Sequence, residues 1–395
     1  MKKNKNEIYI IIVAIFLVVI LLCQRLAIPL SGSDQSKQIP AAVFIMYAFL
    51  GLSWFKKKLE IEIYRFILFI IISCSVLIVS LFSNQISFFS MFYLLGIYIP
   101  FVLFADISAE QYQKILRTYQ IFMLIFALAG IGQILLIFAG VPFFDVFSLL
   151  PAQFLQTNYN TQYPIVYGSP IIKSNGVIFL EPSFYSQFLS LALIIEIVYF
   201  QKIHRIILFL LAMLTSFSGT GLIMLVAAAP FMLSHFVRKP KLRIALTTIL
   251  ILLAVLTAVA GSYGFGDYYS RRMNEFGAKD SSASIRFIAP YKALTEVVSV
   301  NPIWRGSGAG AADDLKFNYE VNFPATPKVI IEYGFVTGSI FTIFLIYCFG
   351  AKQRSFSVAL ACAIMYFFLS GSLLQPQVTY VLFLLTIFFP QSDTG

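Results

Sequence analysis

The sequence predicts an all-α polytopic integral membrane protein, with about 12 transmembrane helices and a long outer loop that contains short helices. Hydrophobic residues make up 59% of the 395 residues and charged residues 12%, against roughly 45–50% and about 25% in soluble domains. The apolar residues form solid runs without alternation, which argues against a β-barrel. This composition excludes a water-soluble enzyme, and the 42 Phe, 21 Tyr and 2 Trp exclude a disordered chain.

The apolar runs give the predicted spans. A bilayer core of about 30 Å needs about 20 apolar residues in each helix. The seventh and twelfth of the candidate segments are short. The twelve segments are 8–23, 39–55, 66–83, 86–105, 119–140, 177–200, 206–218, 221–236, 244–262, 329–350, 357–374 and 378–390.

Lysine and arginine residues orient these spans. Seventeen of the 28 basic residues lie in short segments on one side, before the first span and after the second, fourth, sixth, eighth and tenth. The positive-inside rule makes this side cytoplasmic, so both termini are expected in the cytoplasm. We therefore expect a multi-pass protein of the cytoplasmic (inner) membrane. The net charge of +10 follows from this topology and does not indicate nucleic-acid binding.

The same topology divides the chain into five parts. Residues 1–140 hold helices 1–5, 141–176 an outer loop, 177–262 helices 6–9, 263–328 a long outer loop and 329–395 helices 10–12. Eight of the eleven remaining basic residues lie in the long outer loop. Cations concentrated on the outer face indicate an anionic ligand there. The alternative is that long loops cross the membrane whatever their charge.

Motifs for metals and common cofactors are absent from the sequence. The four cysteines lie inside apolar runs, so we expect free thiols and neither disulfides nor a metal site. No CxxC, HExxH, P-loop or GxGxxG pattern occurs. Zinc hydrolysis, P-loop ATP chemistry and dinucleotide redox chemistry therefore have no support, and we expect neither metal nor cofactor.

Glu181 is the first candidate for chemistry. It stands between the Asn175-Gly176 pair and Pro182-Ser183. Proline is favoured in the first turn of a helix, so the sixth span is predicted to begin at Pro182 with Glu181 at its mouth. The helix dipole favours the ionised carboxylate there. Glu181 is either a plain helix-start residue, a base for the acceptor or a residue that orients an arginine.

A polar break separates the seventh and eighth spans. The stretch 216–221 reads Ser-Phe-Ser-Gly-Thr-Gly and places Ser218 and Thr220 on the outer side. Such a break can expose backbone N–H groups at the start of a helix, which suits a phosphate. The alternative is a tight turn without a ligand.

The long outer loop contains the arginines expected to bind phosphate. Apolar residues recur at helical spacing between Arg286 and Asn301, which predicts an amphipathic helix near the membrane surface. The glycines of 306–310 then predict a sharp turn directly after Arg305. A guanidinium binds two phosphate oxygens at once and stays charged, so Arg286 and Arg305 are natural diphosphate ligands. The alternative for any one of them is a solvated charge.

The order of these motifs resembles the O-antigen polymerase and O-antigen ligase superfamily of bacterial surface-polysaccharide assembly. The resemblance covers about 175–340. It rests on the stretch 175–183, the turn 218–221, a lone Arg286 in a long loop, the turn 301–310 and the stretch 332–338. It implies a fold like that of the C-type glycosyltransferases and a transfer reaction that needs no metal ion. Such an enzyme transfers a glycan from undecaprenyl diphosphate in the outer leaflet to an acceptor.

The resemblance also implies roles for individual residues. Lys173 stands where the family often has an arginine, but a lysine cannot form a bidentate fork. Arg286, Arg305 and Glu181 are the expected catalytic residues, with Glu320 as the second candidate base. The expected substrate-binding residues are Lys173, Arg271, Arg272, Ser218, Thr220, Glu320 and Glu332.

The motifs favour a polymerase over two alternatives. Ligases of this superfamily use a histidine late in the long loop, whereas 322–328 has none, and His204 and His235 are predicted to be cytoplasmic. A transporter with twelve helices is the third possibility, but there is no internal repeat and few charges lie inside the spans. The polymerase would make O-antigen, capsule or exopolysaccharide. Its expected partners are a lipid-linked glycan donor and acceptor and membrane lipids, with a chain-length regulator protein also considered.

Overall fold

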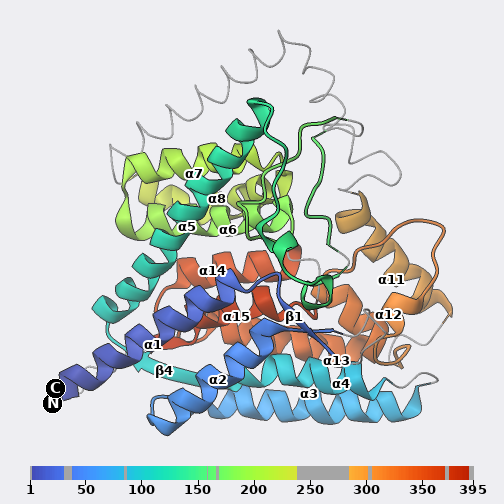
Figure 1. Ribbon diagram of the computed structural model, residues 1–395. Helices are drawn as coiled ribbons and strands as arrows, with labels where there is room; N and C mark the ends of the chain where they lie inside the picture. Colours follow the sequence, from blue (N-terminus) through green and yellow to red (C-terminus); the bar gives the residue numbers. More distant parts are fainter. Residues whose placement is uncertain are drawn as a thin grey trace.

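The computed structural model describes residues 2–30, 38–83, 87–157, 159–165, 169–237, 284–300, 305–369 and 373–390. Helices dominate these ranges (Figure 1). The α-helices are α1 (Lys2–Leu22), α2 (Ala41–Phe55), α3 (Ile63–Phe82), α4 (Phe88–Tyr98), α5 (Ala109–Phe138), α6 (Pro182–Ile195), α7 (Ile203–Thr215), α8 (Gly219–Val237), α11 (Ala289–Val300), α12 (Ala311–Asp314), α13 (Ala325–Gly350), α14 (Phe356–Ile364) and α15 (Pro376–Thr386). Short 3-10 helices are Ile99–Val102, Val146–Leu149 and Ala152–Phe154, and π-helices are Glu196–Phe200, Ser284–Ile288 and Met365–Leu369.

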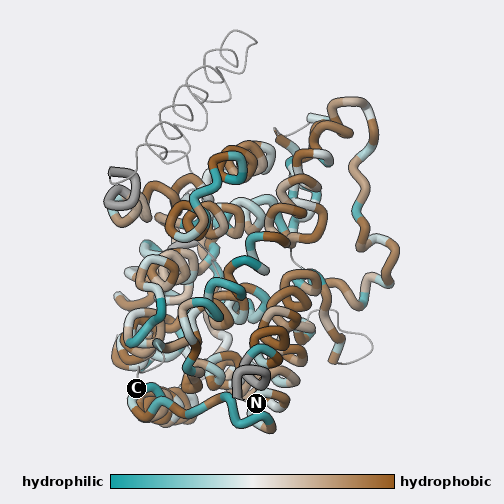
Figure 2. Tube along the Cα trace, turned by 90° about the vertical axis from the view of Figure 1, so that its left-hand side faces the viewer, coloured by the Kyte–Doolittle hydropathy of each residue, from teal (hydrophilic) through white to brown (hydrophobic). Residues whose placement is uncertain are grey.

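The described helices are those of an integral membrane protein. Four are long and apolar enough to cross a bilayer: α3, α5, α13 and α6 with its π-helical continuation, Pro182–Phe200. Seven shorter apolar helices accompany them. Figure 2 shows hydrophobic residues along most of the helices. The mostly helical fold is thus confirmed, while the number of twelve spans stays a prediction. The predicted ninth span, 244–262, lies outside the described residues.

Two predicted spans, the fourth and the twelfth, end in a strand. The fourth, 86–105, ends as a helix near Pro100, and the chain continues as strand β4 (Leu103–Ile107). The twelfth, 378–390, ends at Thr386 and is followed by strand β5 (Phe388–Pro390). The two strands pair with each other in parallel, with Ala105 opposite Phe388. The side chains of these strands are apolar, and their backbone groups form hydrogen bonds across the sheet. Hydropathy alone cannot distinguish such a segment from the end of a helix.

Helix α6 forms the centre of the bundle. All of its residues are buried, whereas only 28% of the apolar span of α3 and of α5 is buried. Side chains of α5 fix it in place: the Tyr119 hydroxyl donates to the Phe188 carbonyl at 2.9 Å, and the Gln120 amide donates to the Ala192 carbonyl at 2.7 Å. Helices α7, α8 and α14 pack on its other sides. Residues at the first turn of α6 are therefore held on a rigid element.

The segments between helices gather at two ends of the bundle (Figure 1). At one end, strand β3 (Glu60–Ile61), β4 and β5 form a three-stranded sheet. At the other end lie the hairpin of β1 (Ala27–Pro29) and β2 (Gln38–Pro40), the loop 141–157, and α12. The first set belongs to segments predicted to be cytoplasmic and the second to segments predicted to be outer. The topology of the loops and the side that each end faces stay predictions.

A buried arginine ties the sheet end together. Arg65, in the first turn of α3, is 1% exposed. Its guanidinium donates to the Cys348 carbonyl at 3.1 Å and lies 4.8 Å from the centre of the Phe389 ring. The sequence marks Arg65 as one more cytoplasmic charge. The structure shows that it joins α3, α13 and β5.

Candidate functional site

Glu181 and Arg286 form an ion pair at the start of α6. Helix α6 begins at Pro182 as predicted, with Glu181 as its N-cap residue. One carboxylate oxygen of Glu181 lies 3.5 Å from an Arg286 guanidinium nitrogen and accepts a hydrogen bond from the Ser183 hydroxyl at 3.0 Å. The other accepts from the Asn160 backbone N–H at 3.3 Å. Both charged side chains are partly exposed, Arg286 at 24% and Glu181 at 21%.

Arg286 enters the site from the long outer loop. It belongs to the π-helix Ser284–Ile288, which leads directly into α11. The predicted amphipathic helix between Arg286 and Asn301 is thus confirmed as α11. Helix α11 packs on α13. Two predicted catalytic residues, 105 positions apart, therefore meet on two supported elements.

The polar break at 216–221 lies against the first turn of α6. The Thr220 hydroxyl donates to the Ser183 carbonyl at 3.2 Å, and it lies 3.0 Å from the Ser218 hydroxyl. The Gly221 N–H donates to the Ser186 hydroxyl at 3.0 Å. A Cβ atom at Gly221 would lie 2.4 Å from the Ser186 carbonyl oxygen, so the glycine permits α6 and α8 to meet here. Ser218 and Thr220 therefore support the element that carries Glu181.

The Asn175-Gly176 pair builds a tight turn before Glu181. The Asn175 N–H donates to the side-chain oxygen of Gln133 at 3.2 Å, and the Val177 N–H donates back to the Asn175 side chain at 3.0 Å. Gly176 and Val177 have φ values of 63° and 73°. A positive φ is rare for a β-branched residue and carries strain. A Cβ atom on Gly176 would also lie 2.5 Å from the Tyr185 ring, so the turn is fixed against α6.

Lys173 lies near the polar break at 216–221. It is 6% exposed, and its ammonium lies 4.3 Å from the centre of the Tyr163 ring. The next residue, Ser174, donates its N–H to the Thr215 carbonyl at the end of α7 at 3.1 Å. Lys173 is thus near the turn that carries Ser218.

Arg305 lies at a different place, against the end of α3. It is exposed and donates to the carbonyl of Phe82, the last residue of α3, at 3.0 Å. In the described part of the chain, no contact joins it to Arg286. The structure therefore brings together Glu181 and Arg286 of the three expected catalytic residues, and it places Arg305 in a turn against the end of α3.

The glycine turn after Arg305 fits a break in α13. Gly334 has a φ of 81° and interrupts the helix, which leaves carbonyl groups before it without helical partners. The Ser307 N–H donates to the Ile331 carbonyl at 2.8 Å, and the Gly308 N–H donates to the Glu332 carbonyl at 2.9 Å. The described part of the first glycine motif, 305–310, and the second motif, 332–338, are therefore one structural unit.

Glu332 lies beside the cation of Lys328, one helical turn earlier in α13. It is 1% exposed, and one of its carboxylate oxygens lies 4.0 Å from the Lys328 ammonium. The same ammonium donates to both carboxylate oxygens of Asp313 at 2.7 Å. This triad holds α12 on α13. Glu320, the second candidate base, is exposed beyond α12.

Arg271 and Arg272 lie outside the described residues. Within the ranges that the structure covers, no three His, Cys, Asp or Glu side chains gather to hold a metal ion. The pair of Glu181 and Arg286 instead offers one anion and one cation. Such a pair can bind a phosphate through the guanidinium and a hydroxyl through the carboxylate.

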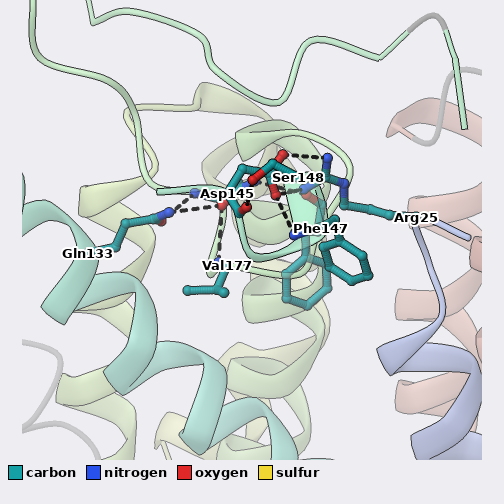
Figure 3. A network of polar contacts seen from close by, with 8 residues as sticks. Arg25, Gln133, Asp145, Phe147, Ser148 and Val177 are labelled. Atoms are coloured by element: carbon teal, nitrogen blue, oxygen red, sulfur yellow. Dashed lines mark hydrogen bonds and ion pairs between the residues drawn. The ribbon is translucent and has the colours of Figure 1, made fainter. Parts of the chain in front are cut away.

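Arg25 and Asp145 form a buried ion pair that was not predicted from the sequence (Figure 3). The two side chains are 7% and 10% exposed, and the second N–O distance of their bidentate contact is 2.7 Å. The Arg25 guanidinium also lies 4.7 Å from the centre of the Phe147 ring. A signal was present: Asp145 is the one charged residue between Arg117 and Lys173. A lone charge in such an apolar stretch needs a partner.

Comparison with known proteins identifies the family. No curated protein and no solved structure matches the chain. A family model described as WcaD colanic acid polymerase matches residues 12–316. The match includes Glu181, Arg286 and Arg305, and it confirms the resemblance to a surface-polysaccharide polymerase. The chain belongs to the WcaD colanic acid polymerase family.

Proposed function

We propose that the chain joins repeat units carried on undecaprenyl diphosphate, at the outer face of the cytoplasmic membrane. Its family and its apolar helices make it a membrane polymerase of exopolysaccharide repeat units. The proposal adds the lipid carrier, the side of the membrane and the residues that act. The ion pair between Glu181 and Arg286 is the observation that carries it.

The geometry of this pair suits a site that opens for substrate. Its contact is single and long, at 3.5 Å, and both side chains are partly exposed. A guanidinium has five N–H donors, and the described contacts of Arg286 use one of them. A diphosphate can therefore bind Arg286 through two parallel hydrogen bonds, which are stronger than the contact with Glu181.

In the proposed reaction, an acceptor hydroxyl attacks the anomeric carbon of the donor glycan. The new C–O bond forms as the bond to the diphosphate oxygen breaks, and undecaprenyl diphosphate leaves with the electron pair. Arg286 stabilises the negative charge that develops on this leaving group. Glu181 accepts the proton of the acceptor hydroxyl and passes it to water.

The other predicted residues take supporting roles in this proposal. Arg305 and Lys173 add positive charge at the outer end, where the glycan and its diphosphate arrive. Ser218 and Thr220 hold the first turn of α6 beside Glu181. Glu332 acts through the triad that fixes α12. Arg271 and Arg272 belong to the predicted long outer loop 263–328, as Arg286 does, and are proposed to bind substrate. Glu320 is the alternative base.

The test is elongation by the purified protein in lipid nanodiscs, supplied with lipid-linked repeat units and no energy source. Wild type should give a ladder of longer glycans, which a transporter would not. Arg286→Ala should abolish the ladder, and Arg286→Lys should restore only part of it because an ammonium lacks the fork. Lys292→Ala is the matched control, since Lys292 lies on α11 at 59% exposure. A normal ladder from Arg286→Ala would remove the assignment.

A further inference from the structure

A group of uncharged polar side chains lies next to the catalytic pair. Its members are Gln24, Gln156, Tyr159, Gln375 and Gln377, which we call the glutamine cluster. They come from the end of α1, the loop before α6 and the start of α15. The Gln377 amide donates to the Gln156 side-chain oxygen at 3.4 Å and to the Tyr159 hydroxyl at 3.5 Å. The Gln156 amide donates to the Gln24 carbonyl at 2.6 Å.

The cluster borders Glu181 directly. Asn160, the residue after Tyr159, donates its backbone N–H to the Glu181 carboxylate at 3.3 Å. The Tyr159 ring packs edge-on against Phe184, in the first turn of α6, with ring centres 6.0 Å apart. A molecule bound by Tyr159 would therefore lie beside the Glu181 carboxylate.

Several side-chain amide atoms of the cluster are buried without a hydrogen-bond partner among the described residues. Gln24 and Gln377 are 0% exposed and Gln375 is 8% exposed. The side-chain oxygen of each lacks a partner among the described residues, and so does the side-chain nitrogen of Gln24. Gln375 precedes α15 as its N-cap but makes no side-chain capping bond. A buried polar atom without a partner destabilises the folded chain. Three in one place indicate that a ligand completes their hydrogen bonds.

The chemistry of the cluster defines the ligand. Amides and a phenol offer both donors and acceptors but no charge, which suits the hydroxyl groups of a sugar. A phosphate or an acidic sugar would require a cation. Gln156 and Tyr159 are half-buried and Asn160 is exposed, so the cluster reaches the surface there. The contacts of Gln377 with Gln156 and Tyr159 are at the long limit for hydrogen bonds, so sugar hydroxyls can replace them.

We propose that the glutamine cluster binds an uncharged sugar ring of the acceptor repeat unit and presents one of its hydroxyls to Glu181. This inference rests on the proposed function for the identity of the acceptor. The cluster borders Glu181, the proposed base for the acceptor hydroxyl, and we therefore assign it to the acceptor. Arg305 lies elsewhere, against the Phe82 carbonyl.

The experiment measures sugar binding apart from elongation. The probe is the lipid-free repeat-unit oligosaccharide, released by mild acid from the lipid-linked pool of the producing cells. Its affinity for the full chain in nanodiscs is measured by isothermal titration calorimetry. Gln377→Leu and Gln24→Leu should each weaken binding at least tenfold, because leucine removes the unpartnered amide oxygen of Gln377 and both unpartnered amide atoms of Gln24. The melting temperature of Gln24→Leu should not fall, because its side chain makes no hydrogen bond among the described residues. The KM for the acceptor should rise by a similar factor.

The matched control is Gln120→Leu. Gln120 is also 0% exposed with an unpartnered side-chain oxygen, but it lies in α5 and donates to the Ala192 carbonyl at 2.7 Å. This variant should lose stability and keep its affinity for the sugar. If Gln377→Leu fails to fold, Gln377→Asn keeps the amide and should still weaken binding, because the shorter side chain withdraws it.

The outcomes separate this inference from the proposed function. Arg286→Ala should bind the free oligosaccharide like wild type and yet fail to elongate. Wild-type affinity in both Gln377→Leu and Gln24→Leu would overturn the sugar site even if elongation proceeds normally. No binding by the wild-type chain would overturn it too. Loss of binding in the two variants would support it even if the purified chain does not elongate.

Discussion

Gly306 packs directly on the backbone of Glu332. A Cβ atom at Gly306 would lie 2.5 Å from the Glu332 carbonyl oxygen and 2.6 Å from the backbone nitrogen of Gly334. Gly306 also has a φ of 67°, in the left-handed region that favours glycine. Conformation and close approach thus both require glycine at this position, where the loop that follows Arg305 meets the break in α13.

Gly306→Ala should therefore destabilise the protein by about 2 kcal/mol or more, from left-handed strain together with overpacking. Elongation should fall in parallel, because Arg305 and α12 would lose their support. Thermal unfolding in detergent measures the effect. Gly132→Ala is the control: no atom lies within 4 Å of its Cβ position in α5. Equal melting temperatures for the two variants would contradict the packing described.

Lys328→Met should be among the most destabilising single substitutions at the outer end. It leaves the buried Glu332 carboxylate without its cation, and breaking a buried pair costs about 3–5 kcal/mol. A second change, Glu332→Gln, should recover much of the loss, because the remaining buried group is neutral. Melting temperatures of the single and double variants test this. If the fall in melting temperature of the double variant equals the sum of the falls of the two single variants, Lys328 and Glu332 do not interact.

Glu62 should make stability depend on acid. Burial acts to raise the pKa of Glu62, but the Arg65 N–H and the Lys352 ammonium outweigh it and hold this pKa below its ordinary value of 4.5. The carboxylate therefore contributes stability that is complete above pH 4.5 and is lost as the pH falls through the lowered pKa. Glu62→Gln should lower the melting temperature at pH 7 and reduce the further loss below pH 4.5. An unchanged acid transition would contradict this.

The histidines should be dispensable. His204 is in the first turn of α7, and His235 is near the end of α8, whereas the end of α7 and the start of α8 lie beside Glu181. Both histidines thus sit at the helix ends remote from the candidate site. The double variant His204→Ala, His235→Ala should keep most of the elongation activity. A folded but inactive double variant would favour the mechanism of a ligase, which uses a histidine base.

The sequence was informative where chemistry is local. Proline and glycine marked the start of α6 and the turn after Arg305, and apolar periodicity marked α11. It was not informative about long-range pairing. Hydropathy could not separate β4 and β5 from helix ends, because strand partners satisfy their backbone groups. The contact of Arg25 with Asp145 joins residues 120 positions apart, and the glutamine cluster combines three segments. Only the folded chain shows which neutral residues meet.

The parallel pairing of β4 with β5 has a consequence for biosynthesis. Ala105 cannot reach its partner Phe388 until the last helices have left the ribosome and entered the bilayer. The sheet end therefore closes late, although β3 and β4 are made early. If translation stalls before 388–390, the inserted helices would leave β4 without its partner β5. Quality-control proteases could then recognise the unpaired edge of β4.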